Sequence, residues 1–264
     1  MDEKVHFLKL KVWKSMDKEE KGMYHLYQKN EVSFALVWII IYCLVSIPIR
    51  GQVGDESPLM LASLALMAIG ITVFIKKYHL EGKYGLDSYP KRPRSYLYFI
   101  PVWILTTGNL WGGFSLSYTG LAQLWAVLSM LLVGYIEEVI FRGFLFQGLL
   151  AKDGAAKAIV VVSVTFGIGH IVNLFAGQAN LETLLQIVFA IAWGFLFTSI
   201  VYKSKSLIPC ILAHGMVNAF SKFAQESVLS KWGYIFVTIL VAAFYCPYLL
   251  KLKDEEDEED EKSI

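Results

Sequence analysis

The chain has 264 residues, of which 56% are hydrophobic, and its formal net charge is only +1. Its mean hydropathy of +0.50 excludes an ordinary soluble domain of this length and predicts an all-α, polytopic membrane protein. The nearly balanced charge gives no reason to expect nucleic acid as a partner. Three cysteines without a CxxC pair favour neither a disulfide framework nor a zinc–thiolate site.

Apolar segments close to the ~20 residues that cross a bilayer recur along the chain. They cover residues 32–49, 58–75, 95–111, 119–150, 155–174, 183–202, 206–220 and 232–252. The fourth is too long for a simple span, and the seventh is short and begins near Pro209, which favours a partial or irregular span. We therefore predict about eight transmembrane helices in one bundle over residues 32–252. A basic segment (residues 1–31) precedes this bundle, and an acidic, disordered tail (residues 253–264) follows it.

Basic residues gather in alternate loops. The N-terminal segment and the loops after the second, fourth and sixth apolar segments hold most of them, whereas the intervening loops hold Arg50, Lys222 and Lys231. Cytoplasmic loops of membrane proteins carry an excess of lysine and arginine. This pattern predicts a multi-pass protein of the cell membrane with both termini in the cytoplasm.

Two adjacent glutamates lie deep inside the fourth apolar segment, in the run from Met130 to Arg142. An acidic residue at the middle of a spanning helix costs roughly +2.5 to +3.5 kcal/mol, so intramembrane carboxylates usually have a function. Glu138 and Arg142 are four residues apart and can form an ion pair on one helix face. Glu137 points about 100° away and has no local partner, so it is free to face a cavity.

Two histidines also lie within apolar segments, His170 in the fifth and His214 in the seventh. Asn218 follows His214 by one helical turn, and a histidine and an amide so placed can both donate hydrogen bonds to one developing oxyanion. Helix lengths put His170 and Asn218 at the depth of Glu137, with His214 a turn nearer the cytoplasm. Nearby glycines would let the helices approach closely: Gly134, Gly143, Gly167 and Gly169.

Three motifs occur in order, each within an apolar segment: EExxxR at residues 137–142, FxxxH at residues 166–170 and HxxxN at residues 214–218. Together they resemble the signature of the CAAX prenyl endopeptidase and bacteriocin-processing family of intramembrane proteases, also called the abortive-infection family. The resemblance covers roughly residues 118–220. It implies an eight-helix intramembrane endopeptidase whose water-filled cavity opens toward the cytoplasm.

The resemblance also implies catalytic roles. Glu137 would be the general base that activates water, and His170 would help to hold or polarise that water. His214 and Asn218 would stabilise the oxyanion of the tetrahedral intermediate. The compact chain is similar to the prokaryotic branch, whose members are associated with bacteriocin self-immunity, peptide-pheromone maturation and membrane-protein processing.

The resemblance leaves the cofactor open, with Glu138 and Arg142 as a supporting pair. Two histidines and a glutamate could bind Zn²⁺ beside an open water position, and relatives have been described as metalloproteases and as glutamate proteases. Because there is no HExxH motif, we favour direct activation of water by glutamate and histidine. The expected partners are membrane lipid and a hydrophobic or lipidated peptide or protein substrate.

Two other functions fit a buried carboxylate. A proton-coupled transporter would use Glu137 and the histidines as a proton relay, but it leaves the His214–Asn218 pair unexplained. A non-catalytic membrane scaffold would keep the fold and bind a partner helix without turnover. Replacing Glu137 by Gln separates them, because only a scaffold should keep its phenotype.

Overall fold

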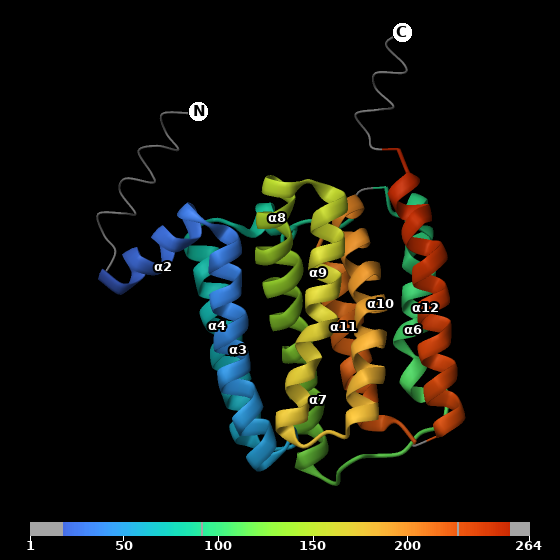
Figure 1. Cartoon of the computed structure of the whole chain (residues 1–264). Helices are drawn as coiled ribbons and strands as arrows, with labels where there is room; N and C mark the ends of the chain where they lie inside the picture. Colours follow the sequence, from blue (N-terminus) through green and yellow to red (C-terminus); the bar gives the residue numbers. More distant parts are fainter. Residues whose placement is uncertain (1–17, 91, 226, 254–264) are drawn as a thin grey trace, which may run out of the picture.

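The computed structural model describes residues 18–90, 92–225 and 227–253, and over these residues the chain is helical, with no strand. The helices run alongside one another as a bundle (Figure 1). Most of the basic N-terminal segment and nearly all of the acidic tail lie outside the described residues. The principal helices are α2 (Lys18–Lys29), α3 (Glu31–Val53), α4 (Pro58–Lys77), α7 (Leu121–Glu138), α8 (Phe146–Asp153), α9 (Ala155–Gly169), α10 (Asn180–Ser204), α11 (Ile208–Phe220) and α12 (Val228–Lys251).

Six helices in the described part of the chain are long and apolar enough to cross a membrane: α3, α4, the continuous helix Leu121–Asp153, Ala155–Phe175, α10 and α12. The helical membrane fold is therefore confirmed, but the count of eight spans is not. The expected span over residues 95–111 is broken into a short helix, α6 (Ile100–Thr106), flanked by 3-10 turns. The expected seventh span is α11, which has 13 residues.

Large apolar side chains cover the outer surface of the bundle. Leu44 on α3 is 70% exposed, Leu66 on α4 is 71% exposed and Phe244 on α12 is 76% exposed. A soluble domain rarely exposes such contiguous apolar surface, whereas hydrocarbon tails solvate it well. The outer faces of α3, α4 and α12 are therefore suited to contact lipid.

Local sequence signals set where several helices begin. Asn30 precedes α3, and its side-chain oxygen accepts a hydrogen bond from the Ser33 amide at 3.0 Å. Ser57 caps α4 in the same way, with Pro58 at the first helical position. Such caps satisfy amide groups that have no partner inside the helix. They fix the short α3–α4 connection, which brings Asp55 to the end of the bundle.

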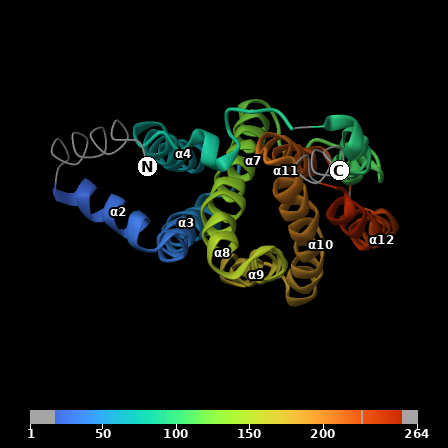
Figure 2. The ribbon, with the colours of Figure 1, turned by 90° about the horizontal axis from the view of Figure 1, so that it is seen from above.

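The bundle has two distinct ends. The α8 end carries the α8–α9 and α10–α11 connections and the last turn of α12, and the opposite end carries the α3–α4, α9–α10 and α11–α12 connections (Figure 1). Viewed from above, α3 and α4 lie on one side of α7, and α12 lies beyond α10 on the other (Figure 2). Helix α7 packs against α4 and α11, and α10 packs against α9 and α12. The motif-bearing helices α7 and α11 are therefore neighbours inside the bundle, and the third, α9, packs against α10 and α8.

Candidate active site

A cavity of about 890 Å³ lies among the central helices, and Glu137, His170, His214 and Asn218 all line it. The chain thus brings three motifs, more than 80 residues apart at their extremes, to one cavity lined by both polar and apolar side chains. Helix α3 forms another wall, although none of the three motifs lies on it. From this level the lining continues to the loops of the α3–α4 end.

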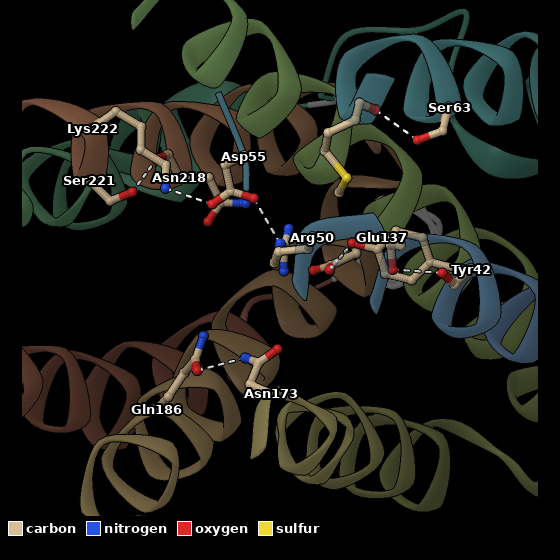
Figure 3. A network of polar contacts seen from close by, with 12 residues as sticks. Tyr42, Arg50, Asp55, Ser63, Glu137, Asn173, Gln186, Asn218, Ser221 and Lys222 are labelled. Carbon is tan, nitrogen blue, oxygen red and sulfur yellow. Dashed lines mark hydrogen bonds and ion pairs between the residues drawn. The ribbon is translucent and has the colours of Figure 1, made fainter. Parts of the chain in front are cut away.

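Glu137 has two polar partners within the bundle. The Tyr42 hydroxyl on α3 donates a hydrogen bond to Glu137 Oε1 at 2.7 Å (Figure 3). His214 Nε2 lies 3.6 Å from Glu137 Oε2. The sequence predicted a carboxylate without a local partner, and both partners indeed come from distant helices. Nothing in the apolar α3 sequence distinguishes Tyr42 as a site residue, so the motifs could not reveal it.

Glu138 is completely buried, and one of its carboxylate oxygens, Oε1, contacts both Arg142 and His214. Arg142 Nη1 donates to Glu138 Oε1 at 2.8 Å, which confirms the predicted pair across one turn. His214 Nδ1 contacts the same oxygen at 2.7 Å. The Arg142 guanidinium also lies 4.1 Å from the centre of the Phe166 ring, a favourable cation–π contact. Glu138 therefore orients His214 and neutralises Arg142 at once.

A π-helical segment, Val139–Leu145, follows Glu138 directly and contains Arg142. All seven of its residues are buried. Single π-helical turns inside α-helices are rare and are common at functional sites. The long fourth segment is thus a single helix, α7 through α8, whose winding changes at the motif.

His170 lies at the end of α9, where the helix tightens into a 3-10 segment, His170–Ala176. Its Nδ1 lies 3.1 Å from the Phe166 carbonyl oxygen. Because a carbonyl only accepts hydrogen bonds, Nδ1 carries the hydrogen, and Nε2 of the neutral ring is an acceptor. His170 can therefore accept a hydrogen bond from a water molecule in the cavity.

The depths of the α11 residues differ from the sequence estimate. His214, not Asn218, lies level with Glu137, since His214 Nε2 approaches that carboxylate. Asn218 lies one turn farther along α11, toward the α3–α4 end (Figure 3). The estimate assumed that all helices start at one depth, whereas α11 is short and starts at Ile208.

Two of the four expected glycine contacts are close. A Cβ on Gly134 would lie 2.5 Å from the Gly215 amide nitrogen, and one on Gly167 would clash with Ile191 of α10. Gly134 therefore lets α7 and α11 touch beside His214. In contrast, a Cβ on Gly143 would meet only ordinary contacts at 3.7 Å, and one on Gly169 would meet nothing within 4 Å. The expectation is wrong for these two.

Charged residues that the motifs did not predict line the open part of the cavity. Asp55 accepts from Arg50 Nε and from Lys222 Nζ, each at 2.7 Å (Figure 3). Burial disfavours ionisation of Asp55, but the two cations outweigh burial and hold its pKa below the ordinary value of 3.8. Asp55 therefore stays ionised at neutral pH and connects the α3–α4 loop to the end of α11.

The side chains do not fit a three-ligand metal centre. Within the described ranges, no group of three or more His, Cys, Asp or Glu side chains surrounds one point at binding distance. The inward ring nitrogen Nδ1 of His214 is also occupied by Glu138.

Together these features define a class: a helical multi-pass membrane protein with a carboxylate–histidine site inside the bundle. Residues 119–220 match the family described as Type II CAAX prenyl endopeptidase Rce1-like. The matched segment contains all three motifs and helices α7 to α11, so the central part of the chain is similar to that family of membrane proteases. A search of curated proteins gives no match.

Proposed function

We propose that the protein is an intramembrane endopeptidase that hydrolyses a peptide bond of a membrane-associated or lipophilic substrate. The observation that carries the proposal is the Glu137 carboxylate, which lies in a cavity and is held by the Tyr42 hydroxyl at 2.7 Å. His214 and His170 line the same space. A carboxylate so fixed can act as a general base on water.

In the proposed reaction, a water molecule lies between Glu137 and His170 Nε2. Glu137 removes one proton as the water oxygen attacks the carbonyl carbon of the substrate. His170 accepts a hydrogen bond from the second hydrogen and so orients the lone pair. Glu137 then gives its proton to the leaving amine nitrogen as the carbon–nitrogen bond breaks, which regenerates the carboxylate.

The oxyanion would be stabilised from α11. Glu138 Oε1 lies 2.7 Å from His214 Nδ1, and this contact orients the ring so that its other nitrogen, Nε2, faces the cavity, where it donates a hydrogen bond when it carries a hydrogen. The Asn218 amide, one turn away, supplies the second donor. Donors that are already oriented toward the developing charge cost little reorganisation during reaction. Arg142 keeps Glu138 in place.

The test is hydrolysis of prenylated and unmodified hydrophobic peptides by the purified protein in detergent, with Glu137→Gln as the matched variant. Loss of a general base costs about 100- to 10,000-fold in rate, so we expect the variant to be nearly inactive while its thermal stability stays close to that of the wild type. Repeating the assay with a strong chelator separates metal-dependent from metal-independent cleavage.

Other outcomes would favour the alternatives. Cleavage by Glu137→Gln at the wild-type rate would refute the proposed role of this carboxylate. Absence of cleavage by both folded proteins, together with an unchanged cellular phenotype in Glu137→Gln, would favour a scaffold. Proton-coupled uptake into liposomes that depends on Glu137 would favour a transporter.

A further inference from the structure

Basic side chains are distributed unequally between the two ends of the bundle. In the described part of the chain, the α8 end and its loops carry most of them: Lys29, Lys76, Lys77, Lys83, Arg92, Arg94, Lys152, Lys157, Lys203, Lys205, Lys251 and Lys253. The α3–α4 end carries only Arg50, Lys222 and Lys231 among the described residues. Since basic loops are retained in the cytoplasm, the α8 end is the cytoplasmic one.

The few cations at the α3–α4 end are also neutralised. Arg50 and Lys222 both pair with Asp55, at 2.7 Å each, and Lys231 lies 3.4 Å from Glu182. An ion pair is easier to move across a membrane than a free cation, because its net charge is zero. The α3–α4 end is therefore suited to the side opposite the cytoplasm.

The cavity lies in the half of the bundle toward this same α3–α4 end. On α3 it is lined from Ile39 to Arg50, which is the second half of a helix that ends at Val53. On α10 it is lined from Glu182 to Phe189, the first half. The loops that line it are the α3–α4, α6–α7, α9–α10 and α11–α12 connections, represented by Asp55, Gly112, Gln178 and Gln225.

Two expectations from the sequence are thus incompatible. Termini in the cytoplasm and a cavity open to the cytoplasm cannot both hold, because the cavity extends away from the end where α12 finishes. The distribution of charge decides between them. We propose that substrate enters the active-site cavity from the side of the membrane opposite the cytoplasm; this inference rests on the proposed endopeptidase function.

The substrate class follows from this orientation. The segment to be cleaved must reach the outer side of the membrane first, so an export or membrane-insertion reaction has to supply it. A lipidated C-terminal tail made and kept in the cytoplasm would not meet Glu137. The cavity entrance offers ionised groups of both signs, Asp55, Arg50 and Lys222, which suits a hydrated peptide chain, while Phe141 and Phe166 line the deep part and suit an apolar side chain.

The test is labelling of single cysteines by a membrane-impermeant charged maleimide on intact bacterial cells that express the chain. Cys43 lines the cavity and is replaced by Ser, whereas Cys210 and Cys246 are buried and stay. Gln225→Cys reports on the cavity entrance, because Gln225 is exposed and lines it. Ser88→Cys is the matched control, an exposed neutral residue at the α8 end.

We expect Gln225→Cys to be labelled on intact cells and Ser88→Cys to be labelled only after permeabilisation. The reverse pattern overturns the inference. Peptide hydrolysis by the same variants in detergent keeps the two proposals separate. Reversed labelling with hydrolysis intact leaves the endopeptidase function standing, and the expected labelling without any hydrolysis counts against that function alone.

Discussion

At the scale of single residues, the Tyr42 hydroxyl holds the carboxylate of Glu137, the proposed general base. Tyr42→Phe removes only the hydroxyl that donates to Glu137. A hydrogen bond to a charged group contributes about 1.5–3 kcal/mol, so we expect kcat/KM to fall by about 10- to 100-fold through kcat more than KM. The measurement is steady-state hydrolysis in detergent, with thermal unfolding measured alongside.

The control for that prediction is Tyr135→Phe. The Tyr135 hydroxyl also lies in the bundle, but it pairs with Thr72 Oγ1 at 2.6 Å and not with Glu137. Similar losses of activity in both variants would mean that any missing hydroxyl loosens the bundle. The role of Tyr42 as a positioning residue would then be wrong.

The Glu138–Arg142 pair allows a prediction about stability. Both side chains are fully buried, and removing one member of a buried pair leaves an uncompensated charge that costs about 3–5 kcal/mol. We expect Arg142→Met to lower the free energy of unfolding by about that amount. Adding Glu138→Gln should recover part of the loss. Denaturation in mixed micelles measures both, and a double variant less stable than Arg142→Met would contradict the pairing.

The residues of the site were largely predictable from sequence, but their contacts were not. Charge in hydrocarbon is costly, so Glu137, Glu138 and His214 stand out against their apolar neighbours. Tyr42 does not, because tyrosine is common in membrane helices and its partner lies 95 residues away. The link from Glu138 to His214 was also missed, since spacing reports neighbours within a helix and not contacts between helices.

At the scale of elements, the α7–α11 contact depends on a glycine. A Cβ on Gly134 would lie 2.7 Å from Gly215 Cα, so Gly134→Ala must push α11 and its His214 away from Glu138. Overpacking of this kind costs about 1–3 kcal/mol. We expect loss of most hydrolytic activity and a lower free energy of unfolding, measured by peptide cleavage and by denaturation in micelles.

Gly143→Ala is the matched control for α7 and its continuation. A Cβ at Gly143 meets only the Tyr84 and Val139 side chains at 3.7 Å, and alanine favours helix over glycine by about 1 kcal/mol. This variant should remain active and as stable as the wild type. Equal losses of activity and stability in Gly143→Ala and Gly134→Ala would contradict the prediction, because the effect of Gly134→Ala could then not be assigned to the close approach of α7 and α11.

Hydropathy located the long helices well and the irregular ones badly. Segments such as α4 and α10 are continuously apolar. Backbone N–H and C=O groups without hydrogen bonds are costly in lipid, so such segments form helices. The segment before α6 is different: Leu97 and Tyr98 adopt left-handed φ values of 49°, which split the expected span. Similarly, the π-helical winding around Arg142 lies in a fully buried segment, and its apolar sequence gives no local signal that distinguishes a π-helix from an α-helix.

At the scale of the whole molecule, the ends of the bundle differ in how they are held together. At the α8 end, Lys83 and the Tyr84 hydroxyl both bind Glu31, which joins the α4–α6 connection to the start of α3. At the α3–α4 end, Asp55 joins the α3–α4 loop to Lys222, just beyond α11. Of these two sets of contacts, the Asp55 contacts line the cavity, so they fix the positions of the charged groups at its entrance.

The Asp55 contacts give a prediction with a defined pH dependence. The pKa of Asp55 in the folded protein lies below its ordinary value of 3.8, so ionised Asp55 stabilises the fold above that pH. The contribution is lost only as pH falls below about 4 and the carboxylate becomes protonated. The free energy of unfolding in micelles should therefore show an Asp55-dependent decrease in acid and none between pH 5 and 8.

Asp55→Asn should be less stable than the wild type at neutral pH, and the difference should shrink in acid. A difference in stability that stayed constant with pH would mean that Asp55 contributes only through the geometry of its hydrogen bonds. The conclusion that its negative charge stabilises the fold would then be wrong.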